Sequence, residues 1–386
     1  MMTVVSGKTI LDWLASQRPA MLTLLEELVN TDSGTYDKAG VDAVGERIRG
    51  FLDSQGITHD SIADVRFGDV VRATVGQSSN SSILLMGHRD TVFPKGEAAR
   101  RRFRIENGRA YGPGVADMKA GLVMNAFVLA AFQKFGGAPA PLVGLFTSDE
   151  EIGSPSSRPV IEAEARRARA VFNSEPGRPT GAVVTGRKGG VFMICDVTGK
   201  AAHSGGNFEQ GISAIEEIAR KIIALHALTD IPRGITVNVG LISGGQTVNT
   251  VAPSATCEID LRFITSADRA MMMEKIERII SISHVSGTSA TLGIKGEFLP
   301  VVESVEGKRL FEHYAACAKE MGLDVKGEFT GGCADSGFAV GVGATTLCGT
   351  GPIGGKAHTP EEYLDVDSMV PRAQTLALAV MRLERN

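Results

Sequence analysis

The chain of 386 residues has few cysteines and no marked excess of either charge. Its five cysteines are odd in number and irregularly spaced, which argues against a disulfide framework or a cysteine-based zinc site. A reducing compartment fits this pattern, so we expect a cytoplasmic protein. The 40 basic and 44 acidic residues leave a net charge of −4. That balance gives no electrostatic reason to bind nucleic acid.

Signals for membranes, export and two common chemistries are also missing. No run approaches the roughly 18 apolar residues of a membrane span, so no membrane partner is expected. Residues 1–8 lack the apolar core of a signal peptide. The sequence has no G-x-S-x-G nucleophile elbow, and Gly355-Lys356-Ala357 lacks the residues that complete a phosphate-binding loop.

Glycine, by contrast, is abundant, with 46 of 386 residues, or about 12%. An average protein has about 7%, and the chain shows no collagen period or low-complexity tract that would explain the excess. The excess therefore predicts many tight turns around a site. One glycine-rich segment, residues 331–337, contains Asp335, which lies either near that site or in a structural loop.

Short apolar strands between helices indicate an α/β domain in the first half of the chain. Residues 83–87, 142–146 and 170–173 predict buried strands, and residues 120–135 predict an apolar helix. Apolar residues at helical spacing in 10–28 predict two earlier helices. This alternation is typical of a sheet that helices cover on both faces.

A second pattern begins near residue 187. It predicts strands at 191–197, 235–242, 255–263 and 290–296, and helices at 212–225 and 267–282. The order β-α-β-β-α-β is typical of a ferredoxin-like unit. The α/β character returns from residue 298. We therefore predict one α/β domain from residues 1–186 and 298–386, interrupted by a smaller α+β domain at residues 187–297.

Acidic and imidazole side chains follow three of the predicted strands. His88 and Asp90 follow the first strand, Glu150 and Glu151 follow the second, and Glu175 follows the third. Open α/β sheets bind ligands at the carboxyl ends of their strands. We therefore expect these side chains to converge at one edge of the sheet.

Two more candidates, Asp117 and His358, lie in glycine-rich loops. Carboxylates brought together raise one another's pKa, and a bound cation removes that repulsion. Imidazole and carboxylate ligands suit zinc, with manganese or cobalt as substitutes. One carboxylate can bridge two ions about 3.5–4 Å apart, and His88 and His358 suffice to give each ion one imidazole.

Five motifs, in order around the predicted insertion, together resemble the M20 metallopeptidases. They are Gly87-His88-Arg89-Asp90-Thr91, Tyr111-Gly112-Pro113-Gly114-Val115-Ala116-Asp117-Met118-Lys119, Asp149-Glu150-Glu151-Ile152-Gly153-Ser154, Glu175-Pro176 and Ala202-His203-Ser204-Gly205. The resemblance covers essentially the whole chain. It implies a zinc-exopeptidase catalytic domain with a central mixed sheet flanked by helices, and an inserted ferredoxin-like lid and dimerisation domain.

The resemblance also implies a metal centre with two Zn²⁺ ions per chain, for which Mn²⁺ or Co²⁺ could substitute. Asp117 is then the bridging ligand. His88 and Glu175 complete one metal, and Glu151 and His358 complete the other.

The remaining roles follow from the same resemblance. Asp90 holds the His88 ring by its second N–H. Glu150 is the general base that takes a proton from a metal-bridging water and returns it to the leaving amine. In the lid, His203 reaches the partner subunit's site and stabilises the oxyanion, which implies a homodimer. Asn249 and Arg262 bind the substrate carboxylate, for which an arginine fork is well suited.

The function implied is hydrolysis of an amide bond next to a free carboxylate, in a small peptide or N-acyl amino acid. Release of a C-terminal glutamate is the most specific form of this implied function. N-acyl amino acid deacylation and dipeptide hydrolysis stay open, because Met118 replaces an Asp of the family's glutamate carboxypeptidases. Its acetylornithine and succinyl-diaminopimelate deacylases share the Asp-Met-Lys form. A non-catalytic binding protein on this scaffold is the alternative of another class, but no ligand or base is missing from the sequence.

Overall fold

The computed structural model describes residues 7–77 and 81–383. The chain forms two compact units. The first unit comprises Met1–Gly186, Glu303–Thr330 and Ala334–Asn386, and the second comprises Arg187–Val302 with Gly331–Cys333. The second unit thus extends past residue 297, where the sequence pattern ends it. Residues 1–6, on which the expectation about a signal peptide partly rests, lie outside the described residues.

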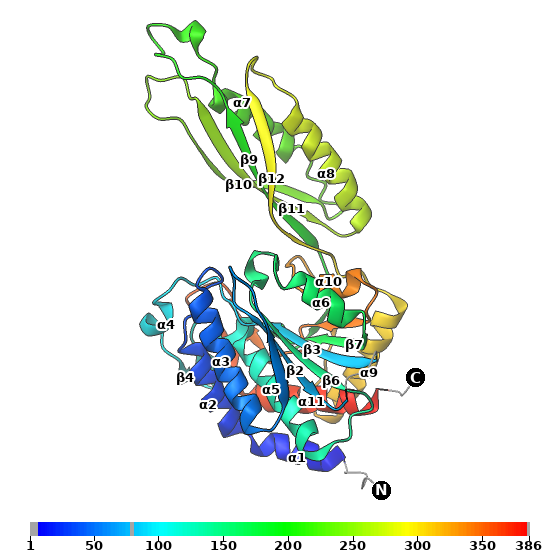
Figure 1. The fold of residues 1–386 in the computed structure, drawn as a ribbon. Coiled ribbons are helices and arrows are strands. Elements are labelled where there is room, and N and C mark those ends of the chain that lie inside the picture. The colour runs from blue at the N-terminus through cyan, green and yellow to red at the C-terminus, as the bar shows by residue number, and fades with distance from the viewer. Residues whose placement is uncertain (1–6, 78–80, 384–386) are drawn as a thin grey trace. The chain divides into compact units, whose positions relative to one another are not determined.

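A mixed sheet of eight strands forms the centre of the first unit (Figure 1). The strand order is β1 (Thr58–Ile62), β2 (Val70–Val75), β6 (Leu142–Thr147), β3 (Ser82–His88), β7 (Ala168–Asn173), β14 (Thr346–Cys348), β8 (Val183–Arg187) and β13 (Gly327–Thr330). β6, β3, β7 and β14 run parallel, whereas β2 and β8 flank them antiparallel. Every residue of β3 and β6 is buried, as expected for parallel strands covered on both faces.

Helices cover this sheet, which confirms the predicted α/β class. One group packs together and consists of α1 (Gly7–Ser16), α2 (Arg18–Val29), α5 (Ala120–Phe135), α9 (Val305–Glu320) and α11 (Met369–Arg382). A pair packs against β7 and β14 and consists of α6 (Arg158–Ala165) and α10 (Ser336–Gly341). Figure 1 shows α6 and α10 on the opposite side of the sheet from α5 and α11. α3 (Lys38–Ser54) packs against β1, β2 and α5.

The central helix of the first unit is apolar on all sides. α5 is buried from Ala120 to Phe132, as is typical of a helix without a polar face. By length and composition, the segment Val115–Phe135 is apolar enough to cross a membrane, with a mean hydropathy of 1.5. Its most apolar window is 94% buried inside the unit, so it serves here as a core helix.

A small second sheet of the first unit lies beside the loop that carries Asp117. It has the order β15 (Gly354–Gly355), β16 (Tyr363–Asp365), β5 (Arg109–Tyr111) and β4 (Arg104–Glu106). The short helix α4 (Glu97–Arg100) precedes β4. None of these short elements was predicted from the sequence.

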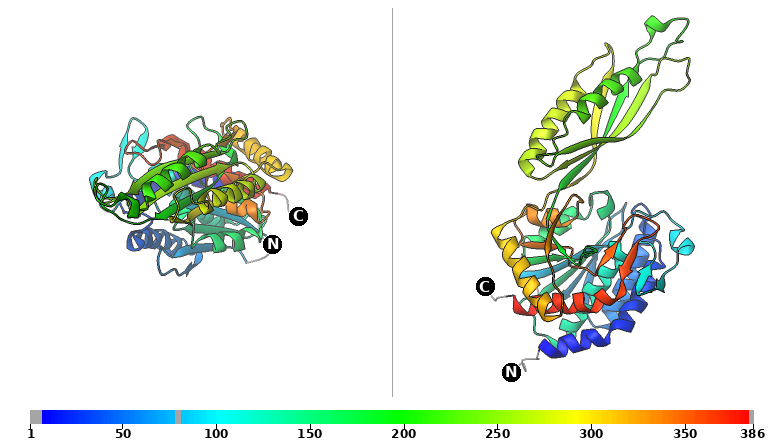
Figure 2. Two further views of the ribbon diagram at one scale, coloured as in Figure 1. Left: turned by 90° about the horizontal axis from the view of Figure 1, so that it is seen from above. Right: turned by 180° about the vertical axis from the view of Figure 1, so that it is seen from behind.

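The second unit has the predicted β-α-β-β-α-β order. Its elements are β9 (Gly189–Thr198), α7 (Ala214–His226), β10 (Thr236–Gly244), β11 (Ser254–Phe263), α8 (Ser266–Ser281) and β12 (Ser289–Phe298). The sheet order is β10-β11-β9-β12, and all neighbouring strands are antiparallel. Burial alternates along β11, so one face of the sheet packs under α7 and α8 (Figure 2). The ferredoxin-like lid domain is therefore confirmed as a separate four-stranded unit.

Candidate active site

The register of the central strands brings the predicted side chains to one edge of the sheet. His88 ends β3 and pairs with Thr147 at the end of β6. On the other side of β3, Met86 pairs with Asn173 at the end of β7. The residues that follow these strands therefore emerge side by side, as the sequence pattern predicts.

The imidazole of His88 faces three carboxylates of the first unit. Its Nε2 atom lies 3.2 Å from Oδ1 of Asp117, 3.7 Å from Oε1 of Glu175 and 3.9 Å from Oε2 of Glu150. The ring is fully enclosed, with only 1% of its side chain exposed. A single imidazole nitrogen thus forms the centre of an acidic cluster.

The imidazole of His358 faces the other side of the same aspartate. Its Nε2 atom lies 3.3 Å from Oδ2 of Asp117 and 3.1 Å from Oε2 of Glu151. Asp117 therefore directs one carboxylate oxygen toward each histidine. This arrangement has the symmetry required of a carboxylate that bridges two cations.

The proton affinities of these groups show how strongly the cluster is charged. Burial alone would lower the pKa of His88, but Glu150, Asp117 and Asp90 raise it well above its usual value. Hydrogen bonds to Asp117 and Glu151 raise the pKa of His358 to about 10. Burial raises the pKa of Glu151 to about 7 and that of Glu150 well above its usual value. More negative charge is collected here than two imidazoles can neutralise.

Divalent cations fit this donor set. One donor atom each from His88, Asp117 and Glu151 all lie within 4.8 Å of one another. Oε1 of Glu151 is buried and, among the residues that the structure describes, has no hydrogen-bond partner. Buried polar atoms are nearly always paired, so an unpaired oxygen beside two ligand candidates matches a metal-binding role.

Asp90 contacts both the His88 ring and the loop of Glu150 and Glu151, and the sequence indicates only the first of these contacts. The nearest acceptor to Nδ1 of His88 is the Asp90 main-chain carbonyl at 3.0 Å, with the Asp90 carboxylate at 3.4 Å. The carboxylate also accepts hydrogen bonds from the backbone N–H groups of Glu150 and Glu151, both at 3.1 Å, and from the Thr35 hydroxyl at 2.7 Å. Asp90 therefore orients the imidazole and fixes the acidic loop.

Two buried aspartates hold the ends of the acidic loop. Asp149 accepts hydrogen bonds from the backbone N–H and hydroxyl of Ser156, at 2.6 and 2.9 Å, which supports a structural role. Asp335 accepts hydrogen bonds from the hydroxyls of Thr147, at 3.2 Å, and Ser154. Burial raises the pKa of Asp335 to about 7. Its place in a glycine-rich segment was the only sequence signal for this contact.

Glu362 is a further buried carboxylate beside the centre, and the sequence patterns did not single it out. It is 0% exposed and accepts hydrogen bonds from three backbone N–H groups of the loop that carries Asp117. The one available signal was its position four residues after His358.

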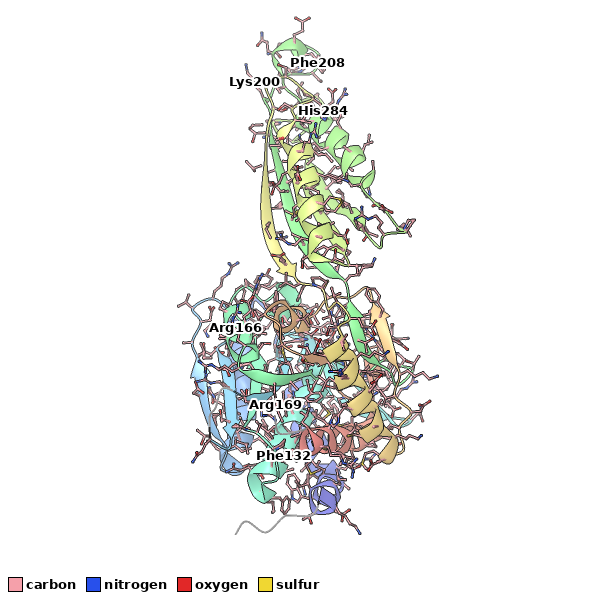
Figure 3. The ribbon with its side chains drawn as sticks, turned by 90° about the vertical axis from the view of Figure 1, so that its right-hand side faces the viewer. Phe132, Arg166, Arg169, Lys200, Phe208 and His284 are labelled. Carbon is pink, nitrogen blue, oxygen red and sulfur yellow. The ribbon has the colours of Figure 1, made fainter. Side chains whose placement is uncertain are left out.

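The candidate residues of the lid lie in the second unit. Nδ1 of His203 accepts hydrogen bonds from the backbone N–H groups of Gly205 and Gly206, both at 3.1 Å. The loop of Asn249 adjoins this turn, because the Ser204 N–H donates to the Asn249 carbonyl at 2.9 Å. Figure 3 shows Lys200 and Phe208, which flank the His203 turn in sequence, together at one end of this unit.

Arg262 lies at the other end of the lid sheet. It pairs with Gly190 near the start of β9, whereas Ser254 pairs with Thr198 at the end of β9. Eight residues of extended strand span about 26 Å. The structure thus brings His203 and Asn249 together but separates both from Arg262 in the same chain.

The Arg262 side chain is held in place by its neighbours. Its Nε atom donates to Asp260 at 2.7 Å, and its Nη1 atom lies 2.8 Å from Sγ of Cys333. The guanidinium lies over the Phe192 ring at 5.0 Å from the centroid. These contacts leave a planar cation pre-oriented on the lid sheet.

A pocket of about 540 Å³ lies beside Glu151 in the first unit. Most of its wall is apolar or aromatic, and an ion pair between Lys95 and Asp37, at 3.2 Å, adds charge. The lining residues are Gly34, Thr35, Tyr36, Asp37, Thr91, Val92, Phe93, Pro94, Lys95, Glu151 and Ile152. A volume of this size is typical of a small-molecule site.

Known proteins resemble this chain over nearly its full length. A family model described as Peptidase family M20/M25/M40 matches residues 84–382. Carboxypeptidase G2 of Pseudomonas sp. (strain RS-16) is 30% identical over 375 residues, which cover 95% of this chain and 90% of the relative. Acetylornithine deacetylase of Vibrio atlanticus (strain LGP32) is 26% identical over 392 residues, covering 95% and 99%.

Solved structures share the fold at lower sequence identity. The M20 family metallo-carboxypeptidase Sso-CP2 from Sulfolobus solfataricus aligns with a TM-score of 0.77 at 18% identity, covering 94% of this chain and 98% of that chain. Aminopeptidase PepT from Bacillus cereus aligns with a TM-score of 0.73 at 20% identity, with the same coverages of 94% and 98%.

Proposed function

Because the chain belongs to peptidase family M20/M25/M40, and is therefore a metallohydrolase, we propose that it cleaves an amide bond next to a free carboxylate. Release of a C-terminal glutamate or a related amino acid, as by carboxypeptidase G2, is the specific form. The observation that carries this proposal is the carboxylate of Asp117, which directs one oxygen to His88 and the other to His358.

Family membership implies a dinuclear metal site, and the donor set supports two Zn²⁺ ions per chain, with Mn²⁺ or Co²⁺ as substitutes. His88 and Glu175 would hold one ion, Glu151 and His358 the other, and Asp117 both. When bound, the ions would neutralise the carboxylates, polarise the scissile carbonyl and increase the acidity of the attacking water.

Glu150 is the proposed proton carrier of the reaction. Its carboxylate would take a proton from the attacking water and then deliver it to the nitrogen of the leaving amine. Burial raises the pKa of Glu150 well above its usual value, which increases its proton affinity. The hydrogen bond from its backbone N–H to Asp90 would hold it in position during both transfers.

The lid supplies the proposed contacts to the rest of the substrate. Arg262 would donate two parallel hydrogen bonds to the free carboxylate, with Asn249 as a further donor. His203 would donate a hydrogen bond to the oxyanion. His203 and Asn249 lie beyond the Ser254 end of β11, whereas Arg262 lies about 26 Å along that strand from Ser254, so the three side chains of one chain would not meet at one small substrate.

This separation supports a homodimer in which each lid completes the partner's site. The edge strand β10 is the proposed surface for the contact, because Leu241 and Ile242 on it are 63% and 60% exposed. An unprotected edge with apolar side chains favours pairing with a second copy.

All five cysteines are free thiols in the structure, which supports the proposed cytoplasmic location.

The pocket beside Glu151 supports an acyl group larger than acetyl on the other side of the amide bond. A cavity of about 540 Å³ would leave an acetyl group largely without contacts. Deacylation of N-acyl amino acids, or hydrolysis of dipeptides, is the second candidate. Met118, in the Asp-Met-Lys form of the deacylases, favours it.

The test is a substrate panel with metal analysis. N-benzoylglutamate, N-acetylornithine and unmodified dipeptides are incubated with protein loaded with Zn²⁺, Mn²⁺ or Co²⁺. We expect cleavage of N-benzoylglutamate with about two ions per chain. Preference for N-acetylornithine would replace the carboxypeptidase proposal by the deacylase. Absence of hydrolysis by the fully loaded protein would leave a binding protein on this scaffold.

A further inference from the structure

Glu362 contacts the metal-site loops without belonging to the proposed ligand set. Its Oε1 atom accepts hydrogen bonds from the backbone N–H groups of Ala116 and Asp117, at 2.8 and 2.9 Å. Its Oε2 atom accepts one from the backbone N–H of Gly114 at 3.1 Å. Three main-chain donors that flank and include Asp117 are therefore satisfied by one side chain.

The small sheet explains how a residue 245 positions away reaches this loop. Tyr363 in β16 pairs with Tyr111 in β5, so Glu362 stands opposite the start of the turn that leads to Asp117. β16 also pairs with β15, and the connection between these two strands carries His358. Glu362 thus joins the loop of one ligand candidate to the hairpin of another.

The chemistry of the contact requires a carboxylate. Both carboxyl oxygens of Glu362 accept hydrogen bonds from backbone N–H groups, whereas an amide side chain has only one acceptor oxygen. The buried Lys119 ammonium donates to the carbonyls of Thr31 and Pro113, at 3.0 and 3.3 Å, so it binds the same loop. A glutamine would place an amide N–H group against one of the three donors.

We propose that Glu362 is a positioning residue that couples the two metal-ligand loops. It fixes the main chain of Asp117 against the His358 hairpin, so that each oxygen of Asp117 faces its own imidazole. The proposal rests on the proposed metal centre but is independent of the substrate.

The test compares Glu362→Gln with the wild type in zinc affinity, by chelator competition with Zn²⁺ on folded protein without substrate. Removing a group that orients a metal ligand typically costs about 10–100-fold in affinity. We expect a loss in that range, together with a fall in kcat at nearly unchanged KM. Glu362→Asp keeps the charge but withdraws it by one methylene, so it should restore part of the affinity.

Glu217→Gln in the second unit is the matched control. Glu217 is also 0% exposed and accepts hydrogen bonds from the backbone N–H groups of His284 and Val285, at 2.8 and 2.7 Å. This change should lower the melting temperature but leave zinc affinity within about twofold of wild type, since its partners are remote in sequence from the metal ligands.

Zinc affinity that is unchanged in both Glu362 variants would overturn the proposal and leave Glu362 a purely structural residue. If Glu362→Gln does not fold, the affinity of Glu362→Asp decides alone, because it must still be measurably weaker than wild type. A wild-type protein that binds no zinc would instead refute the metal centre itself, so the two failures are distinguishable.

Discussion

His88 and Asp90 in the first unit and His203 in the second unit are held in opposite ways. In the first unit His88 and Asp90 are fully buried, and the Asp90 carboxylate alone accepts hydrogen bonds from three groups besides its contact with His88. In the second unit His203 lies on an exposed turn and bonds mainly within that turn. Rigid pre-organisation suits ligands that must hold cations in place. Exposed side chains suit groups that contact a substrate or a second chain after assembly.

The largest effect should come from removing the Asp117 carboxylate, whose two oxygens face the two histidines of the first unit. Asp117→Ala deletes the carboxylate that, alone among the described residues, is within 4 Å of both the His88 and the His358 ring nitrogens. We expect both metals to be lost and activity to fall to the detection limit, as measured by elemental analysis and kcat. Two tightly bound ions in this variant would contradict the bridging role.

Glu150→Ala should separate chemistry from metal binding in the same unit. A positioned acid–base group contributes about 10²–10⁴-fold, and Glu150 serves two proton transfers, so the loss should lie near the upper end. Metal content should stay at the wild-type level. The control variant is Glu361→Ala, which removes an exposed carboxylate on the His358 hairpin and should change kcat little. A near-wild-type kcat in Glu150→Ala would exclude the residue as the base.

The difference between the units also explains what could be predicted from the sequence. The ligand candidates were predictable because each follows a strand or a glycine-rich turn, and parallel strands end at a common edge. The lid order was predictable from the spacing of apolar residues. Glu362 was not, because it acts on backbone N–H groups 245 to 248 residues away, which no side-chain pattern records.

Other features could be recognised only from the register of the paired strands, which the sequence does not give, and not from the presence of the strands alone. Arg262 and Asn249 both match lid residues in sequence, but the pairing of β11 with β9 places Arg262 near one end of β11, whereas Asn249 precedes the other end. The main-chain carbonyl of Asp90 as the nearest acceptor for His88 is equally invisible in the sequence. α3 was missed, although Val44, Ile48 and Leu52 recur at helical spacing on its buried face.

His203→Ala tests whether the exposed turn of the lid serves the partner's site. Loss of one oxyanion donor costs about 10²–10³-fold in kcat. His226→Ala, a histidine of the same unit outside the motifs, should cost far less. Mixing His203→Ala with Glu150→Ala should restore up to about one quarter of wild-type activity, because half of the randomly exchanged dimers are mixed and each has one working site. Demonstrated exchange without recovery would mean that His203 does not act in the partner's site.

Arg262→Ala should have a smaller effect, mainly on KM. A hydrogen bond to a charged group contributes about 1.5–3 kcal/mol, which corresponds to roughly 10- to 100-fold. Arg233→Ala removes an arginine of the same unit that pairs with Asp268 at 2.6 Å, and it should leave KM close to wild type. A substrate with an amidated carboxyl group should be poor for wild type and hardly worse for Arg262→Ala. Equal cleavage of free and amidated substrates by the wild type would contradict the assignment of Arg262 to the substrate carboxylate.

The smallest expected effect concerns the pocket, whose Tyr36 side chain is exposed as the His203 turn of the lid is. Tyr36 lines this pocket and is 72% exposed, so its removal should cost little stability. An aromatic contact contributes about 0.5–1.5 kcal/mol, so Tyr36→Ala should lower kcat/KM for N-benzoylglutamate by roughly 2- to 10-fold. N-acetylglutamate cannot reach across the pocket, so its kcat/KM should stay unchanged.

Phe329→Ala removes another exposed aromatic side chain of the first unit, outside the pocket lining, and should affect neither substrate. An equal loss for both substrates in Tyr36→Ala would mean that the residue acts on the metal site and not on the acyl group. Because only the ratio between the two substrates is interpreted, a small uniform change in active protein does not alter the conclusion.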